Sequence, residues 1–297
     1  MKNTTFSVLL LMIGLANVNA QTTSFHGMAI YQSKTSTSDL KTRFEGNKDI
    51  TPEMRQMIED RMKGMFEKTF ILNFDKSTST YREEEKLETP GTQSPFGGGV
   101  KMMSSIMGGG GTFYKDIKEK KYTVDKEFMG KEFLVKDSLP KLQWKMESET
   151  RQIGGYNCFK ATAVLAVSKS DLRNVKFKDD KKQAEKTESK TTNIMEELEM
   201  PETTTITAWY TPEIPVSHGP ENYWGLPGLI LEANDGKTTV LCSKLVLNPK
   251  EKAVIKAPTN GKVVSQKEYD KIVIEKMDEV RKMNSGRNGN MMQMRMP

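Results

Sequence analysis

The two histidines, His26 and His218, are the side chains best suited to acid–base or metal chemistry at neutral pH. They lie on distant segments, and the sequence has neither a His-Glu-x-x-His string nor paired cysteines with zinc-site spacing. Ser217 precedes His218, but no Gly-x-Ser-x-Gly elbow presents a nucleophile. The glycine clusters at 97–99 and 108–111 lack the Gly-Lys-Ser/Thr string of a phosphate loop. These residues predict a protein that is not an enzyme and has no cofactor.

Methionine is the compositional anomaly: the chain has 20, and 11 of them lie in three segments, 54–65, 102–107 and 291–296. In the first segment four of them recur at helical spacing: Met54, Met57, Met62 and Met65. Flexible thioether side chains on one helix face are typical of an adaptable apolar groove. We therefore expect this helix to contribute to a ligand-binding site.

The chain ends in a Met-x-Met-x-Met string formed by Met292, Met294 and Met296. Thioethers are soft ligands that suit Cu(I), so a copper-handling protein is an alternative hypothesis. Compositional drift in a disordered tail is the simpler interpretation, and we favour it.

The two cysteines, Cys158 and Cys242, both fall in predicted strands. In an oxidising compartment they could form one disulfide, provided that the strands bring the Cα atoms close enough. Two separate buried thiols are the alternative, and the sequence leaves both open.

The N-terminus predicts export. Lys2 precedes the apolar run Val8–Leu15, and small residues end at Ala20. The run has eight residues, whereas a spanning helix needs roughly twenty. We therefore expect a cleaved signal peptide (1–20) and no transmembrane segment. The mature protein would lie in the periplasm or at the outer membrane, or outside the cell. The net charge of +6 is mixed along the chain and predicts no nucleic-acid partner.

Many short strands in succession predict a mainly β (α+β) fold. We expect a single β-rich domain (21–283) built as a curved antiparallel sheet or half-barrel with one or two packed helices, one of them on the concave face. Thr51 and Pro52 open the first helix, and Ser265 and Glu268 form a capping box for the second. A mobile Gly/Met-rich loop (89–111), a charged insert (169–202) and a disordered tail (284–297) complete the prediction.

The segment Thr207–Asp235 is the most distinctive part of the chain, because closely spaced Pro and Gly residues alternate with large aromatic ones. Its Gly-Leu-Pro-Gly-Leu-Ile string at 225–230 resembles the GLPGLI family of exported bacterial proteins. The upstream stretch Ile153–Ala161 is similar to that family's glycine, tyrosine, cysteine, lysine and alanine pattern. The resemblance covers most of the mature chain and implies a signal peptide, but it implies no catalytic residues.

Together these patterns favour a non-catalytic binding or carrier protein of the cell envelope. The ligand would be apolar: a lipid, a lipoprotein segment or a peptide, with an envelope protein as an alternative partner. The candidate ligand-binding residues are the four helical methionines together with Trp209, Tyr210 and Trp224. Copper handling is the first alternative. The second is an enzyme of an unrecognised kind that uses His218 and carboxylates around the GLPGLI string.

Overall fold

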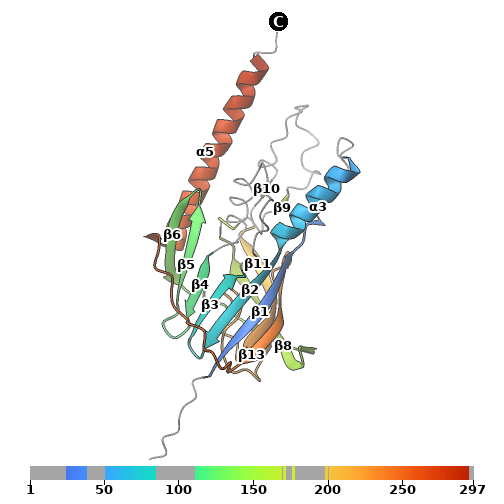
Figure 1. The fold of residues 1–297 in the computed structure, drawn as a ribbon, viewed down its shortest axis with the longest axis vertical. Coiled ribbons are helices and arrows are strands. Elements are labelled where there is room, and N and C mark those ends of the chain that lie inside the picture. The colour runs from blue at the N-terminus through green and yellow to red at the C-terminus, as the bar shows by residue number, and fades with distance from the viewer. Residues whose placement is uncertain are drawn as a thin grey trace, which may run out of the picture.

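The computed structural model describes residues 25–38, 51–84, 111–168, 170–171, 176–177, 198–199 and 201–293. In this part of the chain twelve strands form one open, curved sheet, and two helices extend from one end of it (Figure 1). The predicted mainly β fold with a curved antiparallel sheet is therefore confirmed. The signal segment 1–20, the loop residues 89–110, most of the insert 169–202 and residues 294–297 lie outside the described residues.

The sheet order is β14-β6-β5-β4-β3-β2-β1-β13-β12-β11-β8-β7. Its strands are β1 (His26–Thr35), β2 (Glu67–Asp75), β3 (Thr78–Glu83), β4 (Thr112–Asp116), β5 (Lys121–Phe128), β6 (Lys131–Ser138), β7 (Lys145–Ile153), β8 (Tyr156–Ala166), β11 (Thr203–Thr211), β12 (Leu229–Asn234), β13 (Thr238–Leu247) and β14 (Lys262–Val264). Only β14 and β6 pair in parallel; the other neighbours are antiparallel. A separate two-stranded sheet pairs β9 (Lys176–Phe177) with β10 (Leu198–Glu199).

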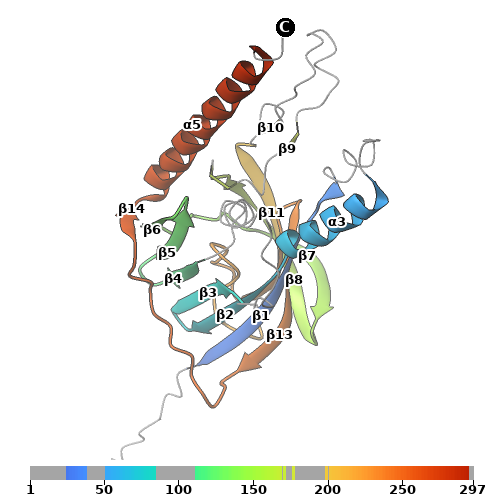
Figure 2. The same cartoon turned by 45° about the horizontal axis from the view of Figure 1, so that its top comes forward.

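The open side of the arch is crossed by a short link, residues 139–144. This link joins β6 to β7, which are consecutive in sequence but lie near opposite ends of the sheet order (Figure 2). The Trp144 indole donates a hydrogen bond to the carbonyl of Trp224 at 2.8 Å. The Trp224 indole donates in turn to the carbonyl of Pro140, also at 2.8 Å. Both ends of the link are thus attached to the segment between β11 and β12, which holds the arch in a half-closed shape.

The interior of the arch is filled by the segment 212–228, which joins β11 to β12. Ile214 and Val216 are buried among the inward-facing residues of the central strands. Tyr31 on β1 reaches the same region, where its hydroxyl donates to the carbonyl of Ile230 at 2.7 Å. Apolar burial of this kind contributes about 25 cal/mol for each Å² removed from water. A folded loop, rather than a methionine-lined helix, therefore supplies much of the core inside the sheet.

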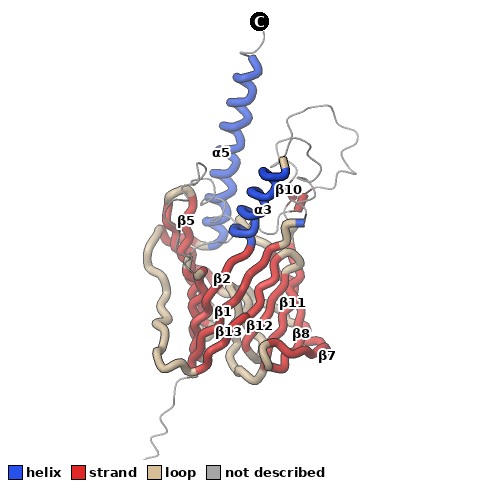
Figure 3. The backbone as a smooth tube through the Cα atoms, turned by 45° about the vertical axis from the view of Figure 1, so that its right-hand side comes forward, coloured by secondary structure: helices blue, strands red, loops and turns tan. Residues whose placement is uncertain are grey.

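The first helix, α3 (Pro52–Phe66), begins as predicted, with the Thr51 hydroxyl accepting from the backbone N–H of Met54 at 3.3 Å. It does not pack on the concave face, because its last residue is followed directly by β2 and no linker allows it to fold back. The helix instead projects beyond the sheet (Figure 3). Met54 is 44% exposed and Met57 is 48% exposed, so the expected methionine-lined groove is not found at these two positions.

The second helix, α5 (Gln266–Gln293), starts with the predicted capping box. The backbone N–H of Ser265 donates to Glu268 at 2.8 Å, and the N–H of Glu268 donates back to the Ser265 hydroxyl at 3.3 Å. Tyr269 and Val273 in its first turns are buried against β5 and β6, so this helix does pack on the sheet.

The C-terminal part of α5 differs from the sequence-based expectation. The helix continues to Gln293, whereas a disordered tail is expected from residue 284. No proline interrupts the chain between Gln266 and Gln293. Asn, Gly and Ser make up six of the ten residues 284–293 and disfavour helix, so intrinsic propensity does not explain this extension. In the described part of the chain, neither helix combines the length and apolar character needed to cross a membrane.

Candidate functional site

The Gly-Leu-Pro-Gly-Leu-Ile string has a structural explanation. Gly225 adopts φ +93°, a left-handed conformation that favours glycine. A Cβ atom at Gly228 would lie 2.1 Å from the carbonyl oxygen of Thr211, so no larger residue fits. Leu226, Leu229 and Ile230 are fully buried. The string therefore turns the chain tightly and packs it against β11, and none of its side chains is placed for chemistry.

Lys115 on β4 holds the turn 219–223, which lies just before this string in the sequence. Its side chain is fully buried, and Nζ donates to the carbonyl oxygens of Gly219 (2.8 Å), Glu221 (2.6 Å) and Tyr223 (3.0 Å). Burial lowers the pKa of Lys115, and the nearby Glu221 carboxylate opposes that shift. Three acceptors match the three N–H bonds of an ammonium group, so the arrangement suits the charged lysine. Lys115 thus clamps the turn 219–223.

His218 sits beside this clamp and is fully buried, with its ring 6.3 Å from that of Phe74. Neither ring nitrogen makes a hydrogen bond of normal geometry to the described residues. Burial, and then the charge of Lys115, lower the pKa of His218 to about 3, although Asp75 raises it somewhat. His218 remains a neutral, buried side chain that does not line the cavity described below.

The pKa of His218 leads to a prediction about acid stability. Between its unfolded value of about 6.5 and its folded value of about 3, the unfolded chain binds one more proton, so stability falls as the pH falls. From pH 7 to pH 4.5 this residue should cost about 2.5 kcal/mol. We expect His218→Leu to remove that loss, measured by urea unfolding at both pH values. An equal loss of stability in variant and wild type would contradict the assignment.

A cavity of about 480 Å³ opens at the mouth of the arch, beside the first turns of α5. This volume lies within the usual range for small-molecule sites. Aromatic rings form much of its wall: Phe70, Tyr81, Phe113, Tyr122, Tyr223 and Tyr269. The charged side chains that line it are Lys126, Asp137, Asp171, Glu221, Asp235 and Asp270. The cavity is therefore aromatic and strongly polar, unlike the methionine-lined apolar groove expected from the sequence.

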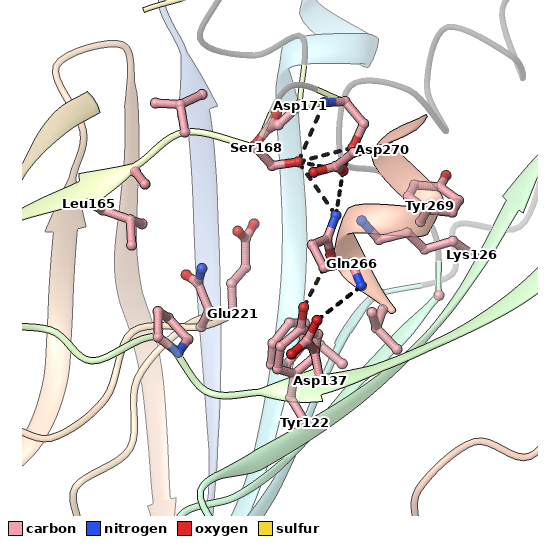
Figure 4. A pocket seen from close by; sticks show the side chains of 18 of the residues that line it. Tyr122, Lys126, Asp137, Leu165, Ser168, Asp171, Glu221, Gln266, Tyr269 and Asp270 are labelled. Carbon is pink, nitrogen blue, oxygen red and sulfur yellow. Dashed lines mark hydrogen bonds between the residues drawn. The ribbon is translucent and has the colours of Figure 1, made fainter. Parts of the chain in front are cut away.

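One wall of the cavity carries an ordered hydrogen-bond network centred on Asp270 (Figure 4). Its Oδ1 atom accepts from the hydroxyls of Ser168 (2.8 Å) and Ser170 (2.6 Å) and from Nε2 of Gln266 (2.7 Å). Tyr122 donates to Oε1 of the same glutamine at 3.1 Å. Burial, reinforced by Asp137 and Asp270, raises the pKa of Tyr122, so its hydroxyl remains a donor. Each polar group is thus held in one orientation.

Glu221 faces this network from the opposite side of the cavity (Figure 4). Its backbone adopts φ +44°, which is uncommon for a residue with a side chain. The hydrogen bond from Lys115 to its carbonyl holds that conformation. Strained backbone of this kind is often found at functional sites. The buried clamp therefore determines where the Glu221 carboxylate lies.

The three aromatic residues predicted to bind ligand lie elsewhere in the fold. Trp209 is covered by the Arg151 guanidinium, 4.1 Å from the ring centroid. Tyr210 packs in the core, and Trp224 attaches the link 139–144. Neither these residues nor Met54 and Met57 line the cavity. The side chains of Met62 and Met65 lie outside the described part of the structure.

Cys158 and Cys242 are free thiols, so the disulfide alternative is not realised. They lie on β8 and β13, and β11 and β12 separate these strands. Burial raises the pKa of each thiol to about 11, which keeps both in the unreactive protonated form.

Among the residues that the structure describes, no three His, Cys, Asp or Glu side chains form a metal-binding group. The backbone of Met292 belongs to α5, but its side chain is not described, and Met294 and Met296 lie beyond the described residues. Copper binding by this string therefore stays a prediction.

The fold and cavity define a class of protein: a half-closed β-arch with a folded plug and a polar cavity at its mouth. A family model described as "Protein of unknown function (Porph_ging)" matches residues 144–232, from the end of the link 139–144 through most of β12. No curated protein matches the chain.

Two crystal structures of PNGF-II, in space groups C2 and P21, are similar to this chain with TM-scores of 0.44 and 0.42. The sequence identities are 15% and 14%, and each match covers 84% of this chain and 33% of that one. This chain thus spans about a third of the length of PNGF-II. Similarity at this level carries no argument about function.

Proposed function

We propose that this protein is a non-catalytic binding or carrier protein of the cell envelope that holds a small ligand in the cavity at the mouth of the arch. The observation that carries the proposal is the ordered wall of this cavity, in which Ser168, Ser170 and Gln266 all donate to Asp270. A pre-formed pocket with a few oriented polar groups among aromatic rings is typical of a ligand site. The proposed ligand therefore has polar groups as well as an apolar body.

Export supports the envelope setting. The signal-like N-terminus and the GLPGLI string together support membership of an exported bacterial family, with action in the periplasm or at the outer membrane. Catalysis is the less supported alternative, because His218 is buried in the core and does not line the cavity. No contact of the described residues favours copper handling.

Neighbouring residues of β8 allow a matched test. Leu165 lines the cavity, whereas Val164 is 64% exposed and points to the other face of the strand. We expect native mass spectrometry of the protein from its own cell envelope to show the added mass of a small organic molecule. Leu165→Trp should lose that mass, because the indole fills the cavity. Val164→Trp should keep it.

Two results would contradict the proposal. One is a bare wild-type chain from its native source that also binds no member of a metabolite library. The other is equal ligand occupancy in the two tryptophan variants, which would place the ligand outside the cavity. Thermal unfolding of both variants controls for damage to the fold.

A further inference from the structure

The geometry points to a ligand that carries a protonated amine, and we infer that Asp270 and Glu221 bind it from opposite walls of the cavity. This inference rests on the proposed binding function and names its ligand class. It uses three observations: an acceptor aimed at the cavity, a positioned carboxylate opposite, and an ammonium group already seated on the aromatic wall.

The Oδ2 atom of Asp270 is a hydrogen-bond acceptor that a ligand can use. The three hydrogen bonds of Asp270 all end on Oδ1, and no hydrogen bond of the described residues ends on Oδ2. A carboxylate oxygen accepts up to two hydrogen bonds, so Oδ2 can receive donors from a ligand. The two serines and Gln266 fix the orientation of the carboxylate before binding. Such pre-organisation reduces the entropy cost of binding a charged partner.

The opposite wall supplies Glu221, whose position follows from the interior of the protein. Lys115 holds the Glu221 carbonyl at 2.6 Å, and the left-handed backbone then directs the side chain toward the cavity. Lys115 is thus a positioning residue for this carboxylate. Two carboxylates that face each other across a cavity suit a ligand with two cationic groups, or one amine with further hydrogen-bond donors.

The aromatic wall shows how an ammonium group fits here. Nζ of Lys126 lies 4.8 Å from the centroid of the Tyr269 ring, within the range of a cation–π interaction. Burial and then Asp270 raise the pKa of Tyr269 to about 12, so the ring remains a neutral phenol. The cavity thus already accommodates one ammonium group of the protein's own chain.

The amine could belong to a free polyamine or to a lysine side chain of a peptide. Isothermal titration with spermidine, with acetyl-Lys-Gly-Lys-amide and with uncharged 1,8-octanediol distinguishes these sources. We expect at least one amine to bind and the diol to bind at least about tenfold more weakly. Asp270→Asn keeps an oxygen for the serines but removes the charge, and should weaken amine binding about 10- to 100-fold. Glu275→Gln, exposed on the same helix, should bind like wild type.

Each outcome has one interpretation. Binding of spermidine alone supports a free amine, and binding of the peptide supports a lysine side chain. Equal affinity for the diol, or an unchanged affinity in a folded Asp270→Asn protein, overturns the amine inference but leaves the proposed cavity intact if Leu165→Trp still removes the native ligand. If Asp270→Asn does not fold, Glu221→Gln replaces it as the test. Loss of amine binding in a folded Glu221→Gln protein then supports the two-wall arrangement. No amine binding to wild type overturns the inference outright.

Discussion

Replacing Lys115 by methionine is expected to destabilise the protein by about 3 kcal/mol. The thioether fills a similar volume but leaves the carbonyls of Gly219, Glu221 and Tyr223 without their donor. An unsatisfied buried acceptor costs about 1–3 kcal/mol, and relief of the buried charge offsets part of the total for three. Equilibrium unfolding in urea at pH 7 measures the change directly.

The matched control for this change is Lys121→Met. Lys121 begins the neighbouring strand β5 and is exposed, so its replacement should alter stability by less than about 0.5 kcal/mol. A Lys115→Met protein as stable as wild type would show that water or a shifted backbone satisfies the three carbonyls, and that the clamp does not hold the turn.

The second large effect is expected at Gly228. In Gly228→Ala the new methyl group would lie 2.1 Å from the Thr211 oxygen and 2.5 Å from its carbonyl carbon. Both atoms belong to the backbone of β11, so no side-chain rotation can relieve the clash. The loop and the strand must separate, and we expect a loss of more than about 3 kcal/mol, or no soluble protein.

Gly154 provides the comparison for Gly228. It has φ +57°, and a methyl group added there would meet nothing within 4 Å. Gly154→Ala should therefore cost only the left-handed backbone penalty, about 1 kcal/mol. The difference between the stability losses of Gly228→Ala and Gly154→Ala separates the cost of steric contact from that of backbone strain. Equal losses in the two variants would contradict the packing explanation of the Gly-Leu-Pro-Gly-Leu-Ile string.

The architecture could be predicted from sequence where local signals were strong. Alternating strands, the Thr51 cap and the Ser265–Glu268 box each report on a few neighbouring residues, and all are found in the structure. The position of α3 could not be predicted in this way. Its methionine periodicity indicates a helix with one apolar side, but the place of the helix depends on the fact that β2 follows its last residue directly.

The residues of the candidate site could not be predicted from the sequence, for a different reason. Ser168, Glu221 and Asp270 belong to three segments that meet only when the sheet curves. Their one local signal is the spacing of Gln266 and Asp270, four residues apart at the start of a helix, which places both on one face. The prominent aromatic residues of the GLPGLI segment are explained by packing and by attachment of the link, which composition cannot distinguish from ligand binding.

The order of strands has a consequence for how the chain folds. Strands β2 to β6 form one run of sequential neighbours and β7, β8, β11, β12 and β13 another, while β1 joins the two runs by pairing with β13. Tyr31 pairs with Cys242, so this junction is among the most non-local contacts of the sheet. Closing such a long loop is slow. The C-terminal half must therefore be present before the first strand gains its second partner, and until then that edge of β1 is open to pairing with other chains.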